Sequence, residues 1–274
     1  MKPSRIKITH IITDLSMGGA EMMLYKLLCG MDPELFESQV ISLTEDGPIG
    51  ERIRGSGIPI KILGLRPNFP NPLLILQLLR WLKEFPQDIV QSWMYHADLI
   101  GGLTANFIKP TSVVWGIRNS TLDPKLSKRS TILTMKACAR LSHSIPTRIV
   151  SCSDAVKHLH VSKGYAADKI IVIPNGFDLE EFHPDPVSRK KVRSEIGIPD
   201  DVFLIGHVGR FDPQKDYPTL IAAAKLLHQR YPDVHFLLCG DRITWENTEL
   251  AEMVDASGLR MVFHLIGMRS DMPQ

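Results

Sequence analysis

Two cationic residues, Arg210 and Lys215, occur in one short loop, Gly209-Arg-Phe-Asp-Pro-Gln-Lys, which follows an apolar run at residues 202–208. Ligands of open α/β sheets bind beyond the carboxyl ends of the strands. An arginine there offers a planar fork and a lysine a mobile point charge, so together they could clamp a diphosphate. The alternative is a solvated loop, because most lysine and arginine side chains are simply exposed.

A second candidate anion site is the pair Gly18-Gly19, which follows the first apolar run and precedes Ala20-Glu21 at the start of a helical pattern. Glycines let the backbone approach a ligand closely, and the free N–H groups of a helix N-terminus attract phosphate. A plain tight turn is the alternative. The segment lacks the G-x-G-x-x-G spacing, so NAD binding is not favoured.

A histidine, His96, lies just beyond the run that ends in Ser92-Trp93, again where a parallel strand should end. A neutral imidazole there could bond a sugar hydroxyl or move a proton. A structural histidine at a helix start is the alternative.

Short apolar runs that alternate with helical patterns should position these residues. We expect strands at 6–12, 38–43, 58–63, 88–92, 112–116, 148–151, 169–173, 202–208, 234–239 and 261–266. Helices are expected at 20–31, 49–55, 71–84, 97–107, 126–143, from 153, at 218–230 and at 247–256. Such alternation with short links predicts parallel sheets covered by helices on both faces.

The chain divides by composition into two α/β regions. Residues 174–199 carry four prolines and a charged run without a strand pattern. We therefore expect a first domain at 1–177, a linker at 178–200 that contains a short helix, and a partial second domain at 201–274. Three strands are about half of a domain of ~100–150 residues.

Composition excludes several classes of protein. The net charge is only +2, which does not suggest nucleic-acid binding. The four cysteines form no C-x-x-C and have no histidine cluster beside them, which favours a reduced cytoplasmic protein without a metal site. The N-terminus is too polar for a signal peptide, and the most apolar stretch, 73–82, is too short to span a bilayer.

The expected helix at 126–143 is basic on one side, where Arg129, Lys136 and Arg140 recur at helical spacing. Leu133, Ala137 and Leu141 form an apolar stripe beside them. Peripheral contact with the inner membrane leaflet is one interpretation. A solvated face over a packed one is the other, and the more common.

Taken together, these motifs resemble the retaining glycosyltransferases of family 4, also called group 1 glycosyltransferases. The resemblance runs along essentially the whole chain, and the order and spacing of the motifs make it specific. They are 12–21 with Gly-Gly-Ala-Glu, 91–102 with Trp93 and His96, Trp115-Gly-Ile-Arg-Asn, Ser151-Cys-Ser-Asp-Ala, Ile173-Pro-Asn-Gly-Phe-Asp, 209–216 and Gly267-Met-Arg-Ser-Asp-Met-Pro.

The resemblance implies a GT-B fold of two Rossmann-like domains, the first for the acceptor and the second for the nucleotide sugar. It implies a hexosyltransferase that uses a UDP- or GDP-sugar and a polysaccharide, lipopolysaccharide or lipid-linked acceptor, with retention and without a metal or other cofactor. Arg210 and Lys215 would bind the donor diphosphate, and the Gly18-Gly19 loop would approach it. His96 would lie near the transferred sugar, and Gly267 and Met268 near the base.

The sequence departs from the family pattern at its end, because the E-x-x-x-x-x-x-x-E motif expected after residue 266 is missing. We expect this chain to have little or no activity by itself. The alternatives are a non-catalytic remnant that binds a sugar nucleotide or a partner, and an unrelated nucleotide-binding α/β protein such as a nucleotide-sugar epimerase. The latter is disfavoured because neither a dinucleotide loop nor a serine–tyrosine–lysine triad is evident.

Overall fold

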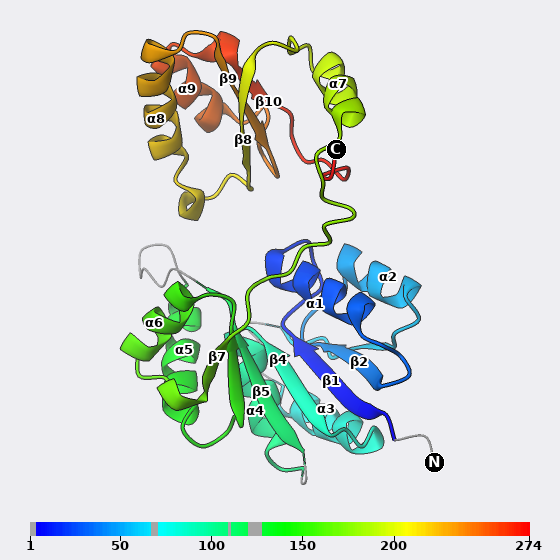
Figure 1. Cartoon of the computed structure of the whole chain (residues 1–274). Helices are drawn as coiled ribbons and strands as arrows, with labels where there is room; N and C mark the ends of the chain where they lie inside the picture. The colour runs from blue at the N-terminus through cyan, green and yellow to red at the C-terminus, as the bar shows by residue number, and fades with distance from the viewer. Residues whose placement is uncertain (1–3, 67–70, 109–110, 120–127) are drawn as a thin grey trace. The chain divides into compact units, whose positions relative to one another are not determined.

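The computed structural model describes residues 4–66, 71–108, 111–119 and 128–274. Contacts divide the chain into two compact units, Met1–Gly176 and Phe177–Gln274, each an α/β structure with a parallel sheet (Figure 1). Residues 178–200, which we expected to link two domains, group with the second unit. Their helix is held there by Arg193, which donates to the carbonyl oxygens of Pro199 and Val202 at 2.6 and 3.0 Å.

The first unit contains a seven-stranded parallel sheet in the order β3-β2-β1-β4-β5-β6-β7. Its strands are β1 Ile6–Ile12, β2 Phe36–Ser42, β3 Ile60–Ile62, β4 Ile89–Trp93, β5 Ser112–Ile117, β6 Arg148–Ser151 and β7 Ile170–Val172. Its helices are α1 Gly19–Gly30, α2 Pro48–Gly55, α3 Pro72–Glu84, α4 Tyr95–Ala105, α5 Arg129–Leu141 and α6 Asp154–Ser162.

Successive strands are added to one side of β1 as far as β3, and to the other side from β4 onward, so the strand order reverses between β1 and β4. From β1 the chain winds outward through β2 and β3, and it then returns through α3 to β4 on the other side of β1. Because parallel crossovers are right-handed, α1 and α2 cover one face, and α3, α4, α5 and α6 cover the other. Two apolar clusters, one on each face, match this arrangement. Ligands of such sheets bind beyond the carboxyl ends of the two strands at the reversal.

The second unit contains a smaller parallel sheet in the order β10-β9-β8. Its elements are α7 Pro186–Glu195, β8 Phe203–Val208, α8 Tyr217–Arg230, β9 Val234–Cys239, α9 Thr248–Ser257 and β10 Phe263–Leu265. Short 3₁₀ turns lie at η1 Ala167–Lys169 in the first unit and at η2 Pro213–Lys215 and η3 Arg260–Val262 in the second. Alternate residues of β9 and β10, such as Phe236 and Phe263, pack with α8 and α9 into one core. Phe203 and Val208 of the edge strand β8 are exposed.

The expected elements agree with the structure to within a few residues at their ends, and the start of the helix expected at 126–143 lies outside the described residues. The expected packing of α5 is wrong at Leu133, which is 66% exposed, although Leu141 packs against the core as expected. The buried residues of α5 are Met135, Cys138 and Ala139. Two apolar rows run along this helix, and the row with Met135 and Cys138 faces α4. Helical periodicity alone does not predict which of two apolar rows is buried. Arg129, Lys136 and Arg140 are exposed.

Candidate functional site

In the second unit, the carboxyl ends of the three strands are joined by backbone hydrogen bonds into a continuous rim. The N–H of Gly209, after β8, donates to the carbonyl of Cys239 at 2.9 Å, and the N–H of Gly240, after β9, donates to Gly267 at 2.8 Å. The Phe211 N–H donates to Asp241 at 2.8 Å. The loops therefore form one rigid edge, which a ligand would meet as a preformed surface. We call residues 209–216, 240–243 and 267–268 the strand-end rim.

Gly240 is the residue that lets this rim close. Its φ of 150° is a conformation that side chains disfavour, and an added Cβ would overlap the Gly209 carbonyl oxygen and lie 2.5 Å from its carbon. The Tyr217 hydroxyl donates to the same oxygen at 2.7 Å. Neither Gly240 nor Tyr217 was singled out from the sequence. The isolated glycine directly after an apolar strand was the available signal for Gly240.

Arg210 and Lys215 both lie on the strand-end rim with exposed side chains. Arg210 Nε donates to Asp212 at 3.2 Å, an ion pair within its own loop. Asp212 is held in turn by the Gln214 N–H at 2.9 Å, and this bond and the Arg210 charge lower its pKa. Exposed ion pairs of this kind contribute little to stability. A phosphate could therefore displace Asp212 from Arg210, or bind Arg210 alongside it.

The Lys215 side chain runs beside Gly209, where an added Cβ would lie 3.5 Å from its Cγ and Cδ. Burial lowers the pKa of His207, and the positive charge of Lys215 lowers it further. His207 packs edge-to-face on Tyr217 with ring centroids 5.1 Å apart. The loop that follows β8 therefore carries two cations, and the neutral His207 and the Tyr217 ring lie beside it. The two positive charges favour an anionic ligand.

Gly267 and Met268 take different positions on the same rim. Gly267 is buried, has a φ of 69°, and its N–H donates to Ile243 at 2.7 Å. Met268 is 68% exposed. The structure therefore gives Gly267 a turn-forming role in addition to the base contact that the resemblance implies, and that contact stays a prediction.

In the first unit, the loops after β1 and β4 flank the reversal point of the sheet. Gly18 caps α1 with its backbone extended and no side-chain cap, and an added Cβ there would overlap the Glu21 carboxylate. An added Cβ on Gly19 would meet nothing within 4 Å, so the helix N-terminus is open on that side. Glu21 therefore already places a negative charge near this helix start, which a ligand phosphate would have to share.

His96 is half-buried in the first turn of α4. Burial lowers its pKa, and the charge of Lys128 lowers it further, so the imidazole is neutral at pH 7. The preceding turn is strained, because Met94 has a φ of 74° while its N–H donates to Gly116 at 3.0 Å. Such strain at a strand end is typical of functional loops. A neutral His96 could donate to or accept from a sugar hydroxyl.

A buried carboxyl group, Asp98, ties the strand ends of this site together. Its Oδ1 accepts from the Ser92 hydroxyl at 2.6 Å and from the Gly116 N–H at 3.3 Å. Asp98 is fully buried, and burial raises its pKa to about 8, so the group is protonated at pH 7. Its burial leaves it a structural role in holding α4 against β4 and β5.

At the carboxyl end of β4, the Trp93 ring packs against two side chains from other segments, which the sequence motif alone did not explain. Its Nε1 donates to Nδ1 of the fully buried His10 at 3.4 Å, and Arg118 stacks on its ring at 4.5 Å. Burial lowers the pKa of His10 to about 4, so this acceptor is neutral at pH 7. Arg118 therefore has a fixed aromatic support at the carboxyl end of β5.

Within the described parts of the chain, no group of three or more histidine, cysteine, aspartate or glutamate side chains could hold a metal ion. The metal-independent chemistry expected from the resemblance stays a prediction. No helix among the described residues has both the length and the apolar character needed to cross a bilayer.

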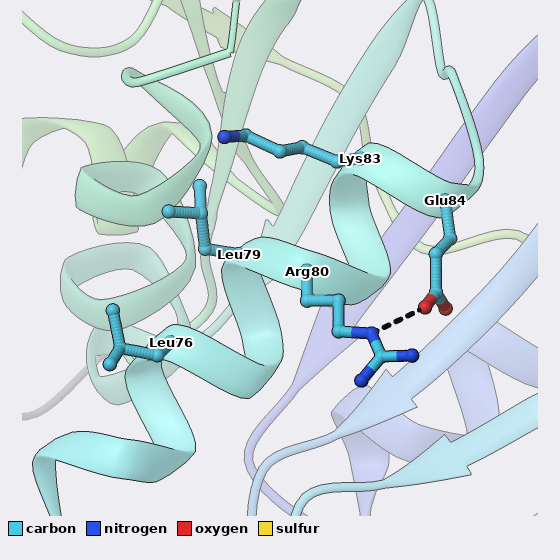
Figure 2. Close-up of a pocket in the computed structure, with 5 residues that line it drawn as sticks. All are labelled: Leu76, Leu79, Arg80, Lys83 and Glu84. Carbon is cyan, nitrogen blue, oxygen red and sulfur yellow. Dashed lines mark hydrogen bonds and ion pairs between the residues drawn. The ribbon is translucent and has the colours of Figure 1, made fainter.

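An open depression of about 400 Å³ lies on α3 (Figure 2). All of its lining residues belong to this one helix, and Arg80 donates to Glu84 at 2.8 Å. Because α3 leads into the amino end of β4, this depression lies away from the carboxyl ends of the strands. It contains none of the predicted site residues.

Two units with parallel sheets, a seven-stranded one and a three-stranded one, match the GT-B fold. The chain belongs to glycosyltransferase family 4. Residues 17–181 match the family model described as Glycosyltransferase Family 4, and residues 188–274 match the one described as Glycosyl transferases group 1. The protein is therefore an enzyme of the glycosyltransferase class, as the motifs predicted.

Two relatives are similar along most of the chain. The UDP-Gal:alpha-D-GlcNAc-diphosphoundecaprenol alpha-1,3-galactosyltransferase of Escherichia coli is 24% identical, over 98% of this chain and 70% of that protein. The putative glycosyltransferase EpsF of Bacillus subtilis is 26% identical, over 88% of this chain and 63% of that protein. The chain thus spans about two thirds of the length of these relatives.

Solved structures share the fold. Anabaena Alr3699/HepE in complex with UDP superimposes with a TM-score of 0.80 at 22% identity, over 98% of this chain and 71% of that one. The UDP-GlcNAc 2-epimerase from Neisseria meningitidis bound to UDP-GlcNAc also shares it, with a TM-score of 0.59 at 14% identity, over 98% of this chain and 74% of that one. The fold alone therefore does not separate transferase from epimerase, and the family matches decide for the transferase.

Proposed function

We propose that the protein transfers a hexosyl group from a UDP-sugar, or a GDP-sugar, to a cell-surface polysaccharide, lipopolysaccharide or lipid-linked acceptor, with retention of configuration. The observation that carries the donor half is the strand-end rim, which presents Arg210 and Lys215 on a preformed edge. UDP is favoured because the first relative uses UDP-Gal and the HepE structures contain UDP and UDP-glucose.

The chemistry proposed for the rim is electrostatic. When the bond between the sugar and the diphosphate breaks, negative charge develops on the leaving diphosphate. Fixed cations and backbone N–H groups stabilise that charge more than they stabilise the intact donor, which lowers the barrier. Arg210 would supply a bidentate fork and Lys215 a point charge, so no metal ion is required.

In the first unit, we propose that His96 contacts the transferred sugar or the acceptor hydroxyl. Its lowered pKa favours a neutral imidazole, which can both donate and accept a hydrogen bond. The Gly18-Gly19 loop is proposed to add backbone N–H groups for a phosphate, since Gly19 faces open space.

The double variant Arg210→Ala/Lys215→Ala is expected to lower UDP affinity by about 100-fold or more, because each of the two charge-assisted bonds is worth ~1.5–3 kcal/mol. Calorimetric titration of the purified chain with UDP, GDP, UDP-glucose and UDP-galactose measures this and identifies the nucleotide. The matched control is Lys225→Ala/Arg230→Ala, which removes the same charges from exposed positions of α8. Equal UDP affinity for the double variant and the unchanged chain would reject the proposed donor site.

A further inference from the structure

Arg118 is a cation in the first unit that the proposed donor site does not use. It follows β5 directly, and its carbonyl accepts a weak bond from Cys152 Sγ at 3.7 Å. The guanidinium stacks on Trp93 at 4.5 Å, and Nη1 donates to Asn175 Oδ1, beyond the end of β7, at 2.6 Å. The side chain is therefore held in one place at the carboxyl edge of the sheet.

The charge of Arg118 has no ionic partner in the described parts of the chain. No described carboxylate lies within 4.0 Å of its guanidinium, and its buried Nε has no hydrogen-bond partner among the described residues. Burial lowers its pKa, and the negative charge of Glu21 acts in the opposite direction. A half-buried cation without an ion pair is costly, and an anion that binds to it offsets that cost.

The surroundings of Arg118 favour an anion of the phosphate class. The only described carboxylate whose charge acts on Arg118 is that of Glu21, and it forms no ion pair with the guanidinium. A planar guanidinium presents paired N–H groups that match two phosphate oxygens. If Arg118 served only as a brace between β5 and β7, the neutral amide of Asn175 would leave its charge unbalanced.

We propose that Arg118 binds a phosphate or diphosphate group of the acceptor, so that the acceptor is a phosphorylated or diphosphate-linked molecule. This inference rests on the proposed function, in which Arg210 and Lys215 hold the donor diphosphate. Arg118 lies in a different unit from those two residues and adds a second anion site to the chain. The hydrogen bond to His10 positions the Trp93 ring, and the ring in turn positions the Arg118 guanidinium that stacks on it.

The test uses the Arg210→Ala/Lys215→Ala chain, in which the donor site is disabled. Titration with inorganic pyrophosphate and with geranyl diphosphate, followed by calorimetry, is expected to show one remaining site. Addition of Arg118→Gln should weaken that site by about 10- to 100-fold, the loss of one or two charge-assisted bonds. The matched control is Arg148→Gln, an exposed arginine at the amino end of β6 on the same sheet.

Three outcomes separate the possibilities. Arg118→Lys keeps the charge but loses the planar fork and its stacking on Trp93, so it is expected to weaken the site by about tenfold and by less than Arg118→Gln does. Equal losses for Arg118→Lys and Arg118→Gln would overturn the proposal in favour of a structural brace. In the otherwise unchanged chain, Arg118→Gln should leave UDP affinity unaltered, and a loss of UDP binding there would assign Arg118 to the donor instead.

The same titrations keep this inference distinct from the donor site. If Arg210→Ala/Lys215→Ala does not weaken UDP binding, the proposed donor site fails, whatever Arg118 does. If that variant loses UDP and no pyrophosphate or geranyl diphosphate site remains, the inference about Arg118 fails and the donor site stands.

Discussion

Gly240→Ala is expected to abolish UDP binding and to destabilise the second unit by about 3 kcal/mol or more. The new Cβ would overlap the Gly209 carbonyl oxygen, and the φ of 150° would itself be strained with a side chain. Relief requires the loops after β8 and β9 to separate, which breaks the strand-end rim and displaces Arg210. Because the new Cβ would meet only backbone atoms, no side-chain rearrangement can absorb the change.

Trp245 provides the measurement, because it packs against the core of this unit. Urea unfolding is followed by its fluorescence, and UDP affinity by calorimetry. The control is Gly206→Ala within β8, where an added Cβ meets nothing within 4 Å. If the Gly240→Ala variant kept the UDP affinity and the unfolding midpoint of the unchanged chain, the strand-end rim would not be rigid.

Asp98→Asn is expected to become more stable than the unchanged chain as the pH rises. The folded-state pKa of Asp98 is raised to about 8, against about 3.8 when unfolded. Its protonation therefore contributes full stability below pH 3.8, and this contribution is lost as the pH rises towards 8. The linkage amounts to about 4 kcal/mol between pH 4 and pH 7. Asparagine does not titrate and escapes this loss.

Urea unfolding of both proteins at pH 4, 5, 6 and 7 measures the difference. Trp245→Phe in both backgrounds restricts the fluorescence signal to Trp81, Trp93 and Trp115 in the first unit. His10, whose pKa is lowered to about 4, changes stability in the opposite direction, but both proteins contain it and its effect cancels. A stability difference that is the same at every pH would show that Asp98 is ionised in the folded protein.

The sequence by itself determined the local structure and the family. Buried parallel strands are continuous apolar runs and their helices have a regular apolar period, so both can be recognised without tertiary information. The motifs at the strand ends, among them Gly18-Gly19, the loop from Gly209 to Lys215 and the segment around His96, follow those runs directly. Their order was enough to identify glycosyltransferase family 4, which the family matches confirm.

Only the tertiary structure decided which residues meet. The sheet order places β1 beside β4, although 76 residues separate their ends at Ile12 and Ile89. Packing against α4 selected Met135 and Cys138 of α5 over the equally periodic row of Leu133. The support of Arg118 by Trp93 and His10, and the need for glycine at position 240, arise from contacts between segments far apart in the chain. Local patterns carry no information about such contacts, because they depend on how the completed sheet brings its strand ends together.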